Sequence, residues 1–395
     1  MSDTAVRTPG LIPVVNTHVH FPPNFSAFAT VADAVGAAAA EGALAVGISN
    51  FFDQQVYRDF AEQADGAGIV PLYGLEFITL VEELAAAGVR VNDPANPGRM
   101  YLCGKGIAPF KDKSAEAARI AADIRTGNDE RARAMVARLA AWFAECGLDT
   151  GLTAERIAQE VAFAAGVPVR WVSLQERHIA MAFQRALAEL EPQLRAEVLA
   201  RAYGEPSAVD LGDPVALQGE LRARLLKVGT PGFVPEVPLG FADAYRYVLE
   251  MDGIPTYPTL ADGVRPVCPF EESPEALAAT LLELGIHAAE LIPVRNAGAC
   301  VDDYVRAFTA AGLIVMAGTE HNTAERIPIE VACADGPVSD YARSAFWEAT
   351  CVVAAHQAEV AAGRPGYVDA TGARTPVATA DLAGLGARLI EGGRR

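Results

Sequence analysis

The sequence lacks the features that mark several large classes of protein. Its 395 residues include six cysteines, scattered without a Cys-x-x-Cys pair, which disfavours both a disulfide framework and a zinc finger. Lys and Arg number 32 against 50 Asp and Glu, and this net charge of −18 argues against nucleic-acid and anionic-membrane partners. A Gly-rich nucleotide-binding loop of either standard form is also missing, so nothing indicates NAD or ATP dependence.

Long uninterrupted apolar runs are absent too. The most apolar window, 31–48, contains Asp33 and Glu41 and is therefore unsuited to crossing a bilayer. The first fifteen residues lack the basic start, apolar stretch and cleavage site of a signal peptide. We expect a cytoplasmic, folded protein of one large or two medium domains, because 51% of its residues are apolar and 21% are charged.

Short β-rich runs alternate with stretches of helical periodicity along most of the chain. Strands are predicted at 11–15, 43–48, 69–75, 100–107, 254–256, 288–294 and 313–317. Helices are predicted between several of them, for example over 31–41, 53–66 and 273–284. Strands and helices in this order predict an α/β fold with a parallel sheet or barrel.

Residues 111–250 interrupt the alternation, because they have little strand signal and are rich in Ala, Glu, Arg and Leu. Helices are predicted here over 114–125, 129–145, 153–165, 174–190 and 214–226. We therefore predict a helical insertion at 111–250 between the fourth and fifth strands, with the barrel formed by 1–110 and 251–395.

Polar side chains follow the predicted strands, where the chemistry of parallel α/β folds gathers. His18 and His20 come after the first strand and are two residues apart, so both imidazoles point the same way from an extended chain. Glu76 follows the third strand and Glu320 the seventh. Each residue alone is equally compatible with a solvated or ion-paired side chain. Together they form a ligand set that suits Zn²⁺, Mn²⁺ or Fe, and we predict a metal site.

Further candidates lie near the same strand ends. They are Asn50, Tyr101, Cys103, Lys105, Tyr257, Arg295 and His321. Tyr101 and Tyr257 are compatible with acid, base or hydrogen-bonding roles, and equally with aromatic packing. His178, within the predicted insertion, is compatible with a helix surface or with the mouth of the site.

These motifs resemble those of the PHP family, named after polymerase and histidinol phosphatase domains, over residues 13–328. The family's His-x-His matches His18 and His20, its Gly-hydrophobic-Glu matches 74–76, and its final Gly-Ser-Asp-x-His is similar to 318–322. The helix 176–180 resembles the family's Arg-Pro-His-Ile-Ala and includes Arg177. The resemblance implies a distorted, TIM-like (β/α)7 barrel and hydrolysis of a phosphate ester by a metal-activated water.

Three histidines of the family pattern are missing. Members commonly hold two or three metal ions, but the corresponding positions here read Asn50-Phe51, Tyr101 and Thr-Tyr-Pro at 256–258. The remaining two imidazoles and two carboxylates predict one divalent ion, Zn, Mn or Fe. Lys105 and Arg295 would supply positive charge in place of the missing ions and would bind an anionic substrate.

The sequence thus predicts a metal-dependent hydrolase of the PHP type that acts on a small anionic substrate. The predicted substrate-binding residues are Lys105, Arg295, Asn50 and Arg177, and the predicted catalytic residues are His178, Tyr101, Tyr257 and His321. One alternative is a mononuclear lyase or isomerase of a sugar acid or another hydroxy or oxo acid. A second is a non-catalytic metal- or ligand-binding protein. The sequence is compatible with a homo-oligomer.

Overall fold

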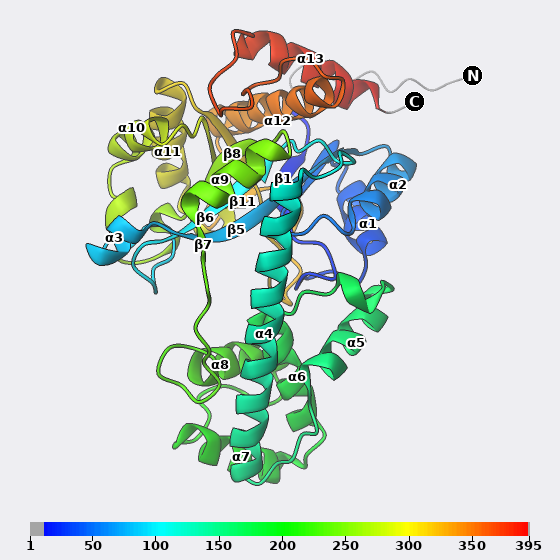
Figure 1. Cartoon of the computed structure of the whole chain (residues 1–395), viewed down its shortest axis with the longest axis vertical. Coiled ribbons are helices and arrows are strands. Elements are labelled where there is room, and N and C mark those ends of the chain that lie inside the picture. The colour runs from blue at the N-terminus through cyan, green and yellow to red at the C-terminus, as the bar shows by residue number, and fades with distance from the viewer. Residues whose placement is uncertain (1–11, 394–395) are drawn as a thin grey trace.

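A computed structural model describes residues 12–393 and shows a mixed α/β architecture (Figure 1). The strands are β1 (Val15–Val19), β2 (Ala45–Ile48), β3 (Asn50–Phe51), β4 (Val70–Leu72), β5 (Gly74–Leu80), β6 (Arg99–Lys105), β7 (Leu239–Gly240), β8 (Ile254–Thr259), β9 (Ala288–Leu291), β10 (Ile314–Ala317), β11 (Ala332–Cys333) and β12 (Gly336–Pro337). They confirm the predicted α/β class, and their parallel pairs include β1 with β2, β2 with β4 and β9 with both β8 and β10.

Helices connect and cover the strands. They are α1 (Val31–Ala40), α2 (Tyr57–Ala67), α3 (Glu82–Ala86), α4 (Ala115–Glu145), α5 (Ala154–Ala165), α6 (Glu176–Ala188), α7 (Pro192–Tyr203), α8 (Pro214–Leu225), α9 (Phe241–Glu250), α10 (Pro274–Glu283), α11 (Gly298–Ala310), α12 (Asp340–Ala361) and α13 (Thr379–Gly392). Local sequence explains several helix starts: the Ser273 hydroxyl accepts from the backbone N–H of Ala276 at the first turn of α10. None of the helices in residues 12–393 has the length and apolarity to cross a bilayer.

The strand β6 departs from the predicted parallel order, because it runs antiparallel to both of its neighbours, β5 and β8. Lys105 at its end pairs with Gly74 and Ile254, which begin those neighbours. The side chain of Lys105 therefore enters from the amino ends of the parallel strands. Tyr101, four residues earlier, lies toward their carboxyl ends.

Backbone hydrogen bonds link β1 to the segment that follows β10. The N–H of Glu320 donates to the His18 carbonyl and the N–H of His20 donates to the Glu320 carbonyl, both at 2.8 Å. On the other side, β2 leads into β3, which pairs with β5 in the seven-stranded sheet. These links connect the three-stranded sheet, whose strand β1 carries His18, to the seven-stranded sheet.

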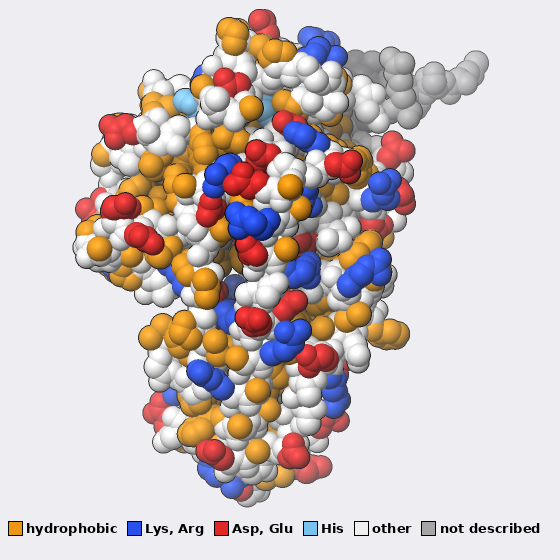
Figure 2. Space-filling view, viewed as in Figure 1, with side chains coloured by type: hydrophobic (Ala, Val, Ile, Leu, Met, Phe, Trp, Pro, Cys, Tyr) orange, Lys and Arg blue, Asp and Glu red, His pale blue; other side chains and the backbone are white. Residues whose placement is uncertain are grey.

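The helix α4 runs from the sheets into the lower part of the molecule, which it forms together with α5 to α8 (Figure 1). This part has its own apolar core, which includes Met135, Phe143 and Phe183. Two helices were predicted where the single helix α4 lies. Asn128 does not end the helix, because its side-chain amide donates to Ser173 Oγ and the Leu174 carbonyl, at 2.9 and 3.0 Å. On the face shown in Figure 2, Lys and Arg are interspersed with Asp and Glu, and the outline narrows above this helical part.

Candidate metal centre

Three of the four predicted ligands converge in the structure. The first strand was predicted at 11–15, whose first residue lies outside the described part of the chain, but β1 spans Val15–Val19 and so contains His18. The alternation of an extended chain still turns both imidazoles the same way, with His18 Nε2 and His20 Nε2 3.4 Å apart. The Glu76 carboxylate lies 3.8 Å from His18 Nε2 and 3.5 Å from His20 Nε2.

These spacings fit a divalent ion. Two atoms held about 2.1 Å from a tetrahedral ion are separated by about 3.4 Å. Burial lowers the pKa of His20 to about 3, with His18 adding to the effect, so the ring is the neutral form that binds metals. Burial, together with Glu320, raises the pKa of Glu76. The ionised form of Glu76 is thus disfavoured, and a cation beside it would stabilise that form. Two imidazoles and a carboxylate are donors that suit Zn²⁺, Mn²⁺ or Fe.

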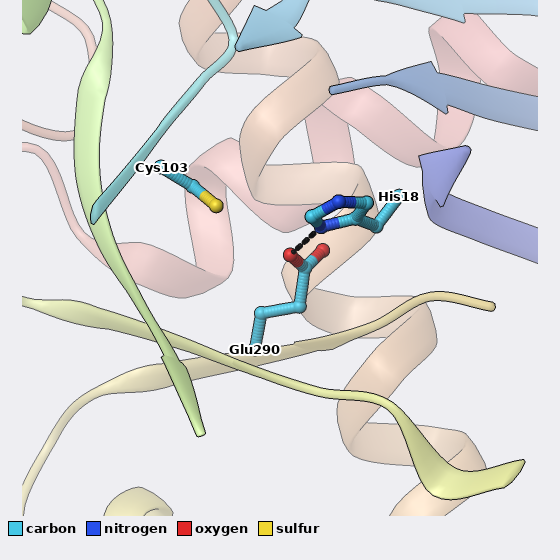
Figure 3. A group of neighbouring side chains, drawn as sticks. All are labelled: His18, Cys103 and Glu290. Atoms are coloured by element: carbon cyan, nitrogen blue, oxygen red, sulfur yellow. Dashed lines mark hydrogen bonds and ion pairs between the residues drawn. The ribbon is translucent and has the colours of Figure 1, made fainter. Parts of the chain in front are cut away.

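Glu290 supports this centre and was missed by the sequence reasoning. Its Oε2 lies 2.6 Å from His18 Nδ1 (Figure 3). A carboxylate on one nitrogen of a histidine orients the ring and leaves the other nitrogen for a metal. Burial alone would raise the pKa of Glu290, but Lys105 and His18 outweigh it and lower the pKa to about 2. The feature of the sequence that points to Glu290 is a single carboxylate in an otherwise apolar strand, and every residue of this strand, β9, is buried.

Lys105, predicted to bind substrate, is buried on the side of His18 that faces Glu290. Its Nζ is 2.9 Å from Glu290 Oε1 and donates to Ser49 Oγ at 2.7 Å and to the Thr17 carbonyl at 2.8 Å. Only 2% of the residue is exposed. The three protons of the ammonium group thus have three oxygen partners, and its charge balances that of Glu290.

Glu320 lies beside the donors and is bound by Arg295. The two Arg295 Nη atoms donate to the two Glu320 oxygens at 3.0 and 2.9 Å, and Asn322 also donates to Glu320. Arg295 outweighs the effect of burial and lowers the pKa of Glu320 to about 2. Within residues 12–393, the two groups of potential ligands whose atoms all lie within 4.8 Å of one another do not include Glu320. Its role as a ligand therefore stays a prediction.

Arg177 is near the same ion pair, at the first turn of α6. Burial lowers its pKa to about 10, with further effects from Arg222, Glu320 and Arg295. Arg177 makes no ion pair with any residue in the described part of the chain. Tyr101 is close enough to affect the pKa of Arg177. Burial raises the pKa of the Tyr101 hydroxyl, and this hydroxyl therefore stays protonated.

Glu176 holds the start of α6 in place. Its carboxylate accepts from Arg131 at 2.7 Å, Arg222 at 3.2 Å and Lys227 at 2.5 Å. Burial would raise the pKa of Glu176, but Lys227 and Arg131 outweigh it and lower the pKa to about 2. Three basic side chains from α4, α8 and the segment after α8 thereby fix the residue next to Arg177.

Tyr257 is not brought to the centre. Its hydroxyl donates to Glu271 Oε1 at 2.8 Å, and both residues are fully buried. Pro258, not Tyr257, pairs with Glu290 across β8 and β9. Because side chains alternate along a strand, Tyr257 points to the opposite face from Glu290.

His321 also turns away from the centre. Its backbone has a φ of 54°, in the left-handed region, so the alternation of the preceding strand does not extend to it. Both ring nitrogens have partners, the Thr319 hydroxyl at 2.7 Å and the Ile327 carbonyl at 2.9 Å. The ring stacks on Phe28. These contacts give His321 a packing role in the structure.

Asn50 and His178 have structural contacts as well. The Asn50 amide accepts from the Phe21 N–H at 2.8 Å and donates to the Phe21 carbonyl at 2.9 Å, so it fixes the segment after β1. His178 Nδ1 accepts from the Gln175 N–H at 3.1 Å, at the start of α6, and its ring packs on Phe25. His178 is not part of the histidine and glutamate cluster.

The buried ring of His178 predicts a pH-dependent stability. Burial lowers its pKa to about 3, so below pH ~6.5 the unfolded chain binds a proton that the folded chain does not. Stability contributed by this group is therefore lost as pH falls, by about 2 kcal/mol between pH 7 and pH 5. The free energy of unfolding in urea should fall by about 2 kcal/mol less between pH 7 and pH 5 in His178→Asn than in wild type. Equal losses in the two proteins would show that His178 is not buried in its neutral form.

Comparison with solved structures shows proteins of similar fold. The sequence matches no protein-family model and no curated protein. The structure is similar to that of a protein from Bifidobacterium adolescentis assigned as a metal-dependent phosphoesterase, with a TM-score of 0.55, 15% identity, and 85% of this chain and 96% of that one covered. It is also similar to an amidohydrolase from Chromobacterium violaceum with bound sulfate and no metal. There the TM-score is 0.51, the identity 17%, and the coverage 81% of this chain and 93% of that one. At these identities the likeness shows a shared fold.

Proposed function

We propose that this protein is a metal-dependent hydrolase of a small anionic substrate, a phosphate ester in the first instance, built on a distorted PHP-type barrel. The convergence of His18 Nε2, His20 Nε2 and the Glu76 carboxylate carries the proposal. A divalent ion bound by these donors would acidify a water molecule and act as a Lewis acid toward the substrate. The two similar structures, one assigned as a phosphoesterase and one as an amidohydrolase, support a hydrolase.

Arg177 and Arg295 would bind the anion of the substrate. Arg295 is close enough to lower the pKa of Arg177, so an anion bound by Arg177 would offset this repulsion. The guanidinium fork of Arg177, which has no ion-pair partner within residues 12–393, suits two parallel hydrogen bonds to a phosphate or carboxylate. The protonated Tyr101 hydroxyl would add a hydrogen-bond donor at the same edge.

The test is a substrate screen on protein loaded with Zn²⁺ or Mn²⁺. We expect turnover of phosphate monoesters that a chelator abolishes and that the same ion restores. Turnover of N-acyl amides alone would show that the protein is a hydrolase of amides and not of phosphate esters. Metal-loaded protein that hydrolyses neither class would contradict the proposed function and would favour a binding protein.

A further inference from the structure

The His18 imidazole has a second side that the proposed reaction does not use. Cys103 Sγ, a Glu290 oxygen and a His18 nitrogen all lie within 4.8 Å of one another (Figure 3). All three residues are fully buried. A thiolate and a carboxylate are donors that bind Zn²⁺ or Co²⁺, whereas His18 Nδ1 stays paired with Glu290 and its Nε2 faces the first centre. This side of the ring therefore has the chemistry of a second metal position.

A cation of the protein already lies there. Lys105 Nζ is 3.4 Å from His18 Nδ1, on the ring nitrogen that faces Glu290, and 2.9 Å from Glu290 Oε1. Its other two partners are Ser49 Oγ and the Thr17 carbonyl. A second divalent ion at this place would meet an ammonium charge at a few Å in a buried region, where repulsion between like charges is large.

The strand β6 delivers both the thiol and the ammonium. Cys103 and Lys105 are two residues apart, so their side chains leave the strand on the same face. Glu76 pairs directly with Cys103 across β5 and β6, which places the two sides of the centre next to each other. Gly74 pairs with Lys105, and a Cβ added at Gly74 would lie 2.7 Å from the Gly104 carbonyl oxygen, 2.9 Å from the Ile48 carbonyl oxygen and 3.3 Å from Lys105 Cδ. The glycine is therefore required first by the close approach of the backbone at this point.

We propose that Lys105 is a resident cation that fills a second metal position and limits the centre to one ion. Without its ammonium group, Glu290 Oε1, Ser49 Oγ and the Thr17 carbonyl would lose their shared cation, and Cys103 would lie beside the vacated place. A divalent ion such as Co²⁺ then binds there with Cys103 as a ligand. The inference rests on the proposed function only for the ion between His18, His20 and Glu76.

The experiment is a Co²⁺ titration of chelator-treated protein, read by elemental analysis and by the thiolate-to-cobalt charge-transfer band. Wild type is expected to bind one ion without the band. Lys105→Ala is expected to bind two ions with the band, and the band should disappear in Lys105→Ala combined with Cys103→Ser. Lys111→Ala is the matched control, because Lys111 is a surface lysine paired with Asp252 at 2.7 Å, and it should behave as wild type.

Two results would overturn the role of Lys105: a wild type that binds a second ion with the band, or a Lys105→Ala that still binds one ion without it. The wild-type arm needs no variant to fold. Lys105→Gln, which is neutral but can still donate to Glu290, replaces the alanine variant if that one does not fold. If wild type binds no ion while the variant binds one with the band, Lys105 has the proposed role and the proposed function fails.

Discussion

Replacing His20 by alanine is expected to weaken Zn²⁺ binding by more than about 100-fold, because loss of an outer-shell partner alone typically costs about 10–100-fold. His20 contributes one of three convergent donors, and its Nε2 lies 3.4 Å from His18 Nε2 and 3.5 Å from a Glu76 oxygen. A solvent-filled gap would replace the imidazole, and the two remaining donors hold an ion poorly. The measurement is a competition titration of chelator-treated protein against a chromophoric chelator.

Two further variants make this prediction specific. His287→Ala removes a half-buried imidazole outside the metal centre, and Zn²⁺ affinity should be unchanged. The hydrogen bond from the Tyr367 hydroxyl to the His287 backbone carbonyl would remain in this variant. Glu290→Gln removes the carboxylate behind His18 and should cost about 10–100-fold, less than His20→Ala. Wild-type affinity in His20→Ala would show that the cluster is not the metal site.

Replacing Arg177 by alanine is expected to lower kcat/KM by about 10–100-fold, with unchanged metal content. A hydrogen bond to a charged group contributes about 1.5–3 kcal/mol, which corresponds to this range. Arg177 has no ion-pair partner within residues 12–393, so substrate is its expected partner. Steady-state kinetics on the best substrate of the screen, beside elemental analysis, measures both quantities.

Arg222→Ala is the matched control for Arg177. Arg222 lies on the same insertion, but its guanidinium is bound by Glu176 at 3.2 Å, and Arg131 and Lys227 would still hold that carboxylate without it. We expect kcat/KM to change little. Equal losses in the two variants would mean that the basic side chains act only by placing α6, and the assignment of Arg177 to the substrate would be wrong.

The sequence predicted the features that depend on local pattern. The alternation of strands and helices is confirmed in outline, and α1 and α10 lie within the helices predicted at 31–41 and 273–284. The His-x-His geometry survives a predicted strand placed four residues too early, because the period of two holds from His18 to His20. Spacing within one extended segment is therefore a safe guide to which side chains share a face.

Features that depend on tertiary partners were not accessible. The direction of β6 is set by its antiparallel pairing with β5 and β8. This direction places Lys105 at the amino ends of the neighbouring strands and not at their carboxyl ends. Glu290 appeared as one polar residue in an apolar strand, and only Lys105, Thr17 and His18 from other strands explain it. His321 was misplaced because a left-handed residue breaks the alternation after β10.

The most direct test of the central claim is the metal content of wild type after incubation with excess Zn²⁺ or Mn²⁺ and gel filtration. Elemental mass spectrometry should find one ion per chain in wild type and none in His18→Ala, whose His18 Nε2 faces both other donors. A wild type without metal, or a His18→Ala that retains it, would contradict a metal centre at these residues.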